Sequence, residues 1–82
     1  MSDKKVTKIA ILGGNPETGA LVDVAKSQGL YTVVLDPFSN SPAKRNADIS
    51  YNVDVTDIDA VGRIIESEGI SAVLVGVADL QY

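Results

Sequence analysis

Two segments forty residues apart follow the same pattern. They are residues 27–35, Ser-Gln-Gly-Leu-Tyr-Thr-Val-Val-Leu, and residues 67–75, Ser-Glu-Gly-Ile-Ser-Ala-Val-Leu-Val. In each, a glycine stands where a helix would end in the left-handed conformation, and an apolar residue follows it. A run rich in β-branched residues comes next without polar alternation, which is typical of a strand covered on both faces by helices. The pattern therefore predicts a doubly wound α/β sheet.

Composition excludes several kinds of function. The chain has 82 residues, enough for one domain with a modest core, and it contains neither cysteine nor histidine. A zinc site and a Ser-His-Asp or Cys-His catalytic centre are therefore excluded within this chain. A net charge of -4 argues against binding to nucleic acid or to an anionic membrane, because both favour clustered Lys and Arg.

The first residues predict no targeting signal. Residues 1–7 read as a polar lead-in, and the apolar run at residues 9–12 is too short for the hydrophobic core of a signal peptide. We therefore expect a cytoplasmic, reducing setting, with the folded domain spanning residues 8–82.

Periodicity and turn residues predict the order of elements. Four strands are expected at residues 8–12, 31–35, 49–53 and 72–75, a helix over 16–28, a short helix over 43–47, and a last helix that starts at a capping box over 56–59 and ends at Gly69. In the first helix the expected buried stripe is Ala20, Leu21, Val24 and Ala25. Right-handed crossovers then give a Rossmann-like, three-layer half-sheet with four parallel strands in the order 3-2-1-4.

This strand order predicts where a ligand would bind. Strands one and four meet at the topological switch point, where ligands bind beyond the carboxyl ends of the strands. The loops that follow them, residues 13–19 and 76–79, are expected to share this rim. The candidate substrate-binding residues are Gly13, Gly14, Asn15, Asp36, Gly76 and Asp79.

Each candidate also has a simpler interpretation. The glycine turn has neither the G-x-G-x-x-G spacing nor the G-K-[ST] of a P-loop, so it either contacts a ligand or is only a tight turn. Asp36 lies 23 residues after Gly13, near the offset of the ribose-binding acid in dinucleotide folds, but Asp-Pro also begins turns. We expect its carboxylate to be exposed at the end of strand two.

Two clusters of charged residues each have a functional and a structural interpretation as well. Lys44 and Arg45 either meet a phosphate or lie on a solvated loop, and we favour the loop. The three aspartates at 54, 57 and 59 are better explained as helix caps and partners of the helix dipole than as metal ligands, so no metal site is predicted.

Three segments carry a resemblance to a known family: Ile11–Gly14, Thr32–Pro37, and Asn40–Ala43 continuing to Ala47-Asp48. Together they resemble the N-terminal, pre-ATP-grasp domain of ATP-grasp ligases. The chain looks most like that domain in carboxyaminoimidazole ribonucleotide synthetase and in proteins similar to the carbamoyl phosphate synthase large subunit. The likeness runs from about Lys8 to Tyr82.

The resemblance implies an activity that lies mostly outside this chain. Such ligases join a carboxylate to an amine or other nucleophile through an acyl phosphate, using ATP and magnesium held by later subdomains. It implies that Gly13 and Gly14 fall in the family's glycine-rich loop, Asp36 and Pro37 at its strand-two turn, and the start of its short helix at Ser41, Pro42 and Ala43. The domain would contribute one rim of the pocket for a small carboxylate or amine substrate. The chain itself, truncated before the ATP-grasp domain, would have no catalytic residue and no cofactor of its own.

One departure from the family bears on the substrate. Where the purine-synthesis enzyme continues its loop with Gly-Gln-Leu-Gly, this chain has Asn15-Pro16-Glu17-Thr18-Gly19. The resemblance therefore favours a ligase like carbamoyl phosphate synthase, with an unassigned substrate, over the purine-synthesis enzyme.

Two other functions remain open. The chain could be an NAD- or NADP-binding module of a redox or regulatory protein, or a packing domain that joins subunits. Because no helix is expected to cover the last strand, an apolar face should stay bare, and we expect a homodimer.

Overall fold

The computed structural model describes residues 7–13 and 16–75. Four of the candidate site residues, Gly14, Asn15, Gly76 and Asp79, lie outside them. The elements are β1 (Lys8–Leu12), α1 (Pro16–Ser27), β2 (Tyr31–Asp36), the 3-10 helix η1 (Pro42–Arg45), β3 (Ile49–Asn52), α2 (Ile58–Glu68) and β4 (Ala72–Val75). The sheet has the order β3-β2-β1-β4 with all neighbours parallel, which confirms the predicted topology.

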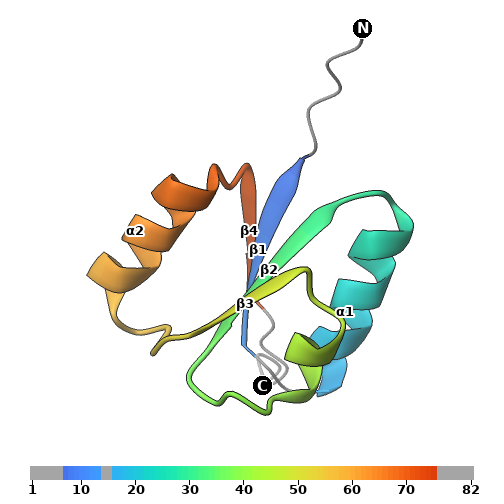
Figure 1. The fold of residues 1–82 in the computed structure, drawn as a ribbon, viewed down its shortest axis with the longest axis horizontal. Coiled ribbons are helices and arrows are strands. Elements are labelled where there is room, and N and C mark those ends of the chain that lie inside the picture. Colours follow the sequence, from blue (N-terminus) through green and yellow to red (C-terminus); the bar gives the residue numbers. More distant parts are fainter. Residues whose placement is uncertain (1–6, 14–15, 76–82) are drawn as a thin grey trace, which may run out of the picture.

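The helices form the two outer layers of a three-layer fold. In Figure 1 the sheet runs through the middle, with α1 and η1 on one side and α2 on the other. The core is accordingly divided by the sheet. One cluster packs under α1 and η1, and consists of Ile9, Ile11, Val22, Ala25, Val34 and Ala43. The other packs under α2, and its buried members are Ala10, Val33, Leu35 and Val61.

Both helices end as the repeated glycine pattern predicts. Gly29 and Gly69 have φ angles of 82° and 68°, in the left-handed region. The residue after each glycine donates its backbone N–H to a carbonyl five residues back, Leu30 to Ala25 at 3.1 Å and Ile70 to Ile65 at 3.0 Å. This is the Schellman arrangement in both copies, so the repeat marks two equivalent helix-to-strand junctions.

The start of α2 differs by one residue from the predicted capping box. The cap is Asp57, whose carboxylate accepts the backbone N–H of Ala60 at 3.2 Å. Thr56 is instead held by Asp54, which accepts both its backbone N–H and its hydroxyl. Asp54 and Asp57 thus serve a turn and a helix start.

The predicted buried stripe of α1 is wrong at two of its four positions, because Ala25 is buried and Leu21 is half-buried. Thr18, Val22 and Ala25 face the sheet, whereas Ala20 is exposed and Val24 is 60% exposed. The helix carries apolar residues on two sides, so hydrophobicity alone cannot choose between them. Its rotation follows the polar side chains Asp23 and Lys26, which hydrogen-bond to the chain after η1.

Strand β4 also departs from the prediction that both its faces are covered. All four of its residues are exposed, although the sequence is uniformly apolar. Val73 pairs in register with Ala10 and Leu74 with Ile11, so the two residues lie on opposite faces of the sheet. Among the described residues, apolar side chains of β4 are therefore exposed on both faces of the sheet.

Candidate functional site

The carboxyl ends of β1 and β2 meet at a glycine turn. Gly13 has a φ of 109°, a conformation that other residues rarely adopt, and its N–H donates to the carbonyl oxygen of Leu35 at 2.9 Å. The turn after β1 is thus fixed to the last residues of β2. This places Gly13 next to Asp36, and it gives the glycine a conformational reason to be there.

Asp36 is buried, contrary to the prediction of an exposed carboxylate. Only 8% of the residue is accessible, because the side chain folds into the turn that follows it. Its Oδ2 accepts the backbone N–H of Phe38 at 2.9 Å and the hydroxyl of Ser41. The carboxylate therefore organises the turn over residues 37–41, and a ligand at this rim would meet a turn already fixed in shape.

Lys44 closes the same cluster from η1. It is 8% exposed, and its Nζ donates to the backbone oxygen of Asp36 at 2.8 Å and to the side-chain oxygen of Asn52. Asp36 and Asn52 are register partners at the ends of β2 and β3, so one ammonium group ties both strand ends together. The prediction of a solvated loop is wrong for Lys44 and right for Arg45, which is exposed.

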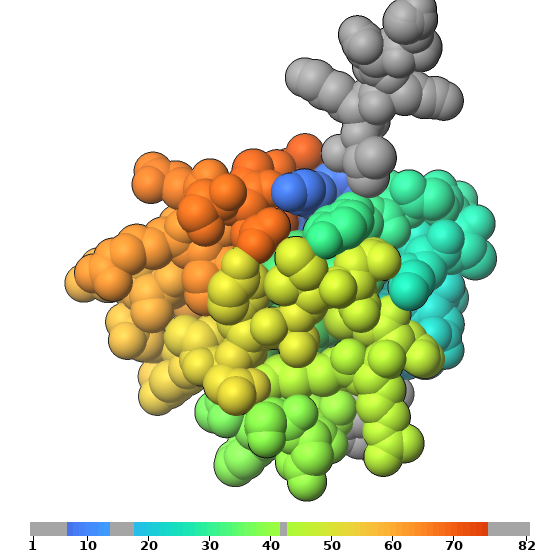
Figure 2. Space-filling model, in the orientation of Figure 1, coloured from blue at the N-terminus to red at the C-terminus, as the bar shows by residue number. Residues whose placement is uncertain are grey.

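This contact also fixes the direction of the Asn52 amide. An ammonium group can only donate, so the amide oxygen must face Lys44 and the NH₂ must point away. In the space-filling view the segment after β2 lies at one end of the molecule (Figure 2).

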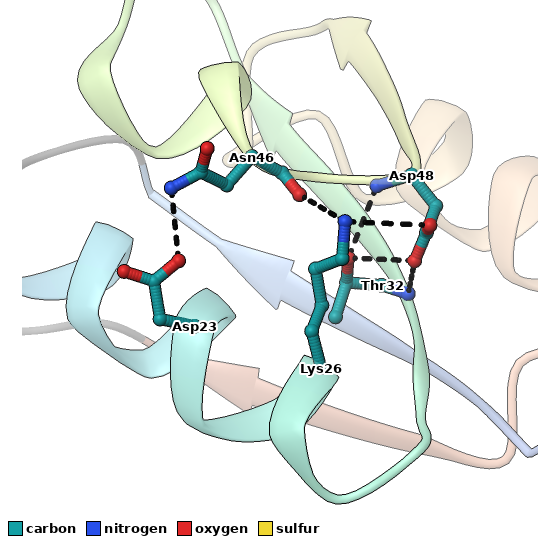
Figure 3. A network of polar contacts seen from close by, with 5 residues as sticks. All are labelled: Asp23, Lys26, Thr32, Asn46 and Asp48. Carbon is teal, nitrogen blue, oxygen red and sulfur yellow. Dashed lines mark hydrogen bonds and ion pairs between the residues drawn. The ribbon is translucent and has the colours of Figure 1, made fainter.

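A second polar network, which was not predicted, lies at the opposite end of β2 (Figure 3). The carboxylate of Asp48 accepts the backbone N–H of Thr32 at 2.8 Å and its hydroxyl at 3.1 Å. Lys26 approaches the same carboxylate at 3.6 Å and donates to the carbonyl oxygen of Asn46 at 2.8 Å. Asn46 in turn donates to Asp23 at 2.8 Å. The spacing of Asp23 and Lys26 on one helix face is the only signal that pointed here.

The network lowers the pKa of Asp48. The main cause is the backbone N–H of Thr32, which favours the ionised carboxylate; burial opposes it, and the Thr32 hydroxyl and Lys26 add to it. A carboxyl whose folded pKa is depressed stabilises the fold above its unfolded value of about 3.9, and this contribution is lost as the pH falls through the folded pKa.

Replacing Asp48 by Asn should therefore remove part of the acid sensitivity of the fold. We expect the Asp48→Asn variant to lose about 1 kcal/mol at neutral pH and to differ less from the parent chain below pH about 4. Chemical unfolding monitored by circular dichroism across pH 2 to 7 measures both. Thr32→Val keeps the backbone donor and should retain most of the pH dependence. A Val variant that loses all of it would show that the hydroxyl, not the backbone, sets the pKa.

A third group holds the end of α2 on the other face. Glu68 accepts the phenol hydroxyl of Tyr51 and lies 3.4 Å from the ammonium of Lys8, which sits 5.1 Å from the centre of the Tyr31 ring. The Tyr51 hydroxyl lowers the pKa of Glu68, and the carboxylate raises the pKa of Tyr51. Polar contacts thus fasten both helices at the amino end of the sheet, while the carboxyl end carries the glycine turn and Asp36.

Comparison with known proteins shows similarity in sequence and in fold. No protein-family model matches the chain. It is 39% identical over 66 residues to a formate-dependent phosphoribosylglycinamide formyltransferase from Hydrogenovibrio crunogenus, a match that covers 79% of this chain and 16% of the relative. The N5-carboxyaminoimidazole ribonucleotide synthetase of Thermotoga maritima superposes with a TM-score of 0.80 at 26% identity, over 93% of this chain and 21% of that one. The chain resembles the N-terminal domain of ATP-grasp ligases.

Two further structures are similar to this chain, and only the first is an ATP-grasp ligase. An ADP complex of an N5-carboxyaminoimidazole ribonucleotide synthetase superposes with a TM-score of 0.76 at 29% identity, over 100% of this chain and 22% of that one. A UDP-glucose 4-epimerase from Thermotoga maritima, solved with UDP-glucose, gives 0.72 at 22% identity over 90% of this chain and 25% of that one, a likeness of fold alone. The chain spans about a fifth of the solved ligases and less of the formyltransferase.

Proposed function

We propose that this chain is the N-terminal, substrate-side domain of an ATP-grasp ligase that joins a small carboxylate to an amine. The observation that carries the proposal is the combined likeness in sequence and fold to a formyltransferase and to synthetases, over nearly the whole chain. In the longer protein, ATP and magnesium would be bound by the downstream domain and the carboxylate would pass through an acyl phosphate. The chain by itself would not be catalytic.

The geometry supports a role in positioning at the rim. Gly13 is fixed to the end of β2, and Asp36 and Lys44 fix the turn after it and the end of β3. A pre-formed rim limits the ordering cost when substrate binds, because its backbone is already held. We propose that Gly13, Gly14 and Asn15, with Gly76 and Asp79 across the switch point, contact the substrate, and that Asp36 acts mainly by holding the turn.

The finer assignments rest on sequence. The loop Asn15–Gly19 departs from that of the purine-synthesis enzyme, which favours a substrate closer to that of carbamoyl phosphate synthase. We also propose a cytoplasmic location and a homodimer. Among the described residues, no helix is long and apolar enough to cross a membrane.

A dinucleotide-binding module is the second candidate. The position of Asp36 at the end of β2 favours it. The burial of Asp36 weakens it, because one carboxylate oxygen already accepts two hydrogen bonds and both oxygens would be needed to hold two ribose hydroxyls.

Calorimetric titration of the chain with NAD, NADP and ATP-magnesium separates these candidates. We expect no heat of binding from any of them. Tight binding of NAD or NADP, abolished in Asp36→Ala, would overturn the ligase proposal.

A chimera gives the positive test. The chain would replace the matching region of the Thermotoga synthetase, and phosphate release from ATP would be followed against a panel of small carboxylates and amines. We expect release that depends on the added substrates and that falls in the Gly13→Val chimera. If the chimera folds but its rate of ATP hydrolysis is the same with and without every added substrate, a substrate-side role would be contradicted.

A further inference from the structure

The chain after the Asp36 turn runs back along β2 and is fixed near both ends of that strand. We call residues 41–48 the 41–48 segment. At its start the hydroxyl of Ser41 donates to the carboxylate of Asp36, at the carboxyl end of β2. At its end the carboxylate of Asp48 accepts the backbone N–H of Thr32 at 2.8 Å, near the amino end of β2. The segment therefore joins the candidate rim to the polar network at the opposite end of the sheet.

Helix α1 lies along the same segment. Gly19, Asp23 and Lys26 are spaced i, i+4 and i+7, so they share one face of the helix. A side chain placed on Gly19 would lie 3.7 Å from the Cα of Ala43. Asp23 and Lys26 each share a hydrogen bond of 2.8 Å with Asn46 (Figure 3). The contacts follow the same order along both elements, so the segment is attached to α1 from its first turn to its last.

The polar contacts decide how α1 is seated on the sheet. Val22 and Ala25 are buried against the sheet. Ala20 and Val24, on the outer side of the helix, are also apolar but exposed. Burial of apolar surface therefore does not by itself hold α1 in this rotation, because turning the helix would replace one apolar side by another. The bonds to Asn46 supply the preference, and they lie in the half of α1 that is farther from the rim.

The two halves of the rim are attached to α1 and to the 41–48 segment respectively. One half is the glycine turn, which begins at Gly13 and leads into α1. The other is the turn over residues 37–41, which Asp36 holds and which leads into the segment. A helix is stiff, so a rotation or shift of α1 at Lys26 is carried to its first residue, about 15 Å away. The distance between the two halves therefore depends on how α1 lies on the segment.

We propose that the 41–48 segment sets the distance between the two halves of the rim, and that Lys26 and Asn46 are positioning residues for a substrate bound there. Both residues act from the opposite end of the sheet. The substrate role rests on the proposed function, whereas the coupling between the network and the rim is a property of this chain alone. Both side chains are exposed, so replacing them removes polar contacts without opening a cavity in the core.

Amide hydrogen exchange measured by NMR tests the coupling without a ligand. The N–H of Gly13 donates to the carbonyl oxygen of Leu35 at 2.9 Å, so its exchange rate reports on the glycine turn. We expect Lys26→Met and Asn46→Ala each to speed exchange at Gly13 about fivefold, the factor that corresponds to one net hydrogen bond. Lys26→Arg keeps the charge and the donors, and should exchange at the rate of the parent chain.

Tyr51→Phe is the matched control. It removes a hydrogen bond to Glu68 at the same end of the sheet, but on the face covered by α2. It should leave exchange at Gly13 unchanged. Equal acceleration in Tyr51→Phe, or none in Lys26→Met and Asn46→Ala, would overturn the coupling. Acceleration in Lys26→Arg as large as in Lys26→Met would also overturn it, because the contact would then be intact and the turn still loosened.

The synthetase chimera described above tests the substrate role. With a substrate that supports phosphate release, Lys26→Met should raise the KM about fivefold and change kcat less, whereas Tyr51→Phe should change neither. An unchanged KM in Lys26→Met would overturn the positioning role. A parent chimera whose phosphate release is the same with and without every substrate contradicts the ligase proposal alone, and the exchange rates at Gly13 still decide the coupling.

Discussion

Replacing Leu35 by Ala is expected to lower the free energy of unfolding by about 3 kcal/mol. Leu35 is fully buried in the centre of the sheet, on the α2 face, with Ala10, Val33 and Val61. Removing its side chain loses the transfer free energy of three carbons and leaves a cavity that two neighbouring strands cannot close. A domain of this size has a modest core, so such a loss takes much of its stability. Urea unfolding monitored by circular dichroism measures it.

Leu74→Ala is the matched control. It removes the same atoms from a strand of the same sheet, but Leu74 is 38% exposed. At concentrations where the chain is monomeric, we expect a loss of less than about 1 kcal/mol. Equal losses at the two positions would mean that β4 is covered in the monomer, and would contradict the exposure of the β4 edge described above.

The strand order could be predicted from sequence because local signals agreed. Gly29 and Gly69 ended helices, apolar runs followed them, and right-handed crossovers left one arrangement. The rotation of α1 could not be predicted in the same way. Ala20, Leu21 and Val24 are as apolar as the residues that face the sheet, and the choice between the two sides depended on Asn46, a partner that lies 20 residues or more along the chain.

The candidate site shows the same division. The position of Asp36 at the carboxyl end of β2 followed from the order of elements, and the structure confirms it. The direction of its carboxylate did not follow, because an Asp-Pro turn can hold the side chain inward or leave it free. The side chain points inward because the hydroxyl of Ser41, five residues later, donates a hydrogen bond to the Asp36 carboxylate. Lys44 could not be distinguished from Arg45 by sequence, since only the packing of η1 buries one and exposes the other.

Lys44 is buried and the adjacent Arg45 is exposed, so we expect their replacement to have very different effects on stability. Lys44→Met should destabilise the fold by about 2 kcal/mol, because it removes two hydrogen bonds from a charged donor while keeping most of the buried volume. Arg45→Met makes the same change of charge one residue later, on an exposed side chain, and should stay within about 0.5 kcal/mol of the parent. Thermal and urea unfolding of the three chains give the comparison.

Hydrogen exchange shows where the loss falls. Lys44 joins the ends of β2 and β3 through the Asp36 carbonyl and the Asn52 amide, so Lys44→Met should speed exchange at Val53, whose N–H donates to that same carbonyl at 3.1 Å. The amides of β1 should keep their relative protection. A methionine variant as stable as the parent would mean that burying the ammonium group costs as much as its two hydrogen bonds return. In that case Lys44 would add no net stability to the turn, although it still joins the ends of β2 and β3.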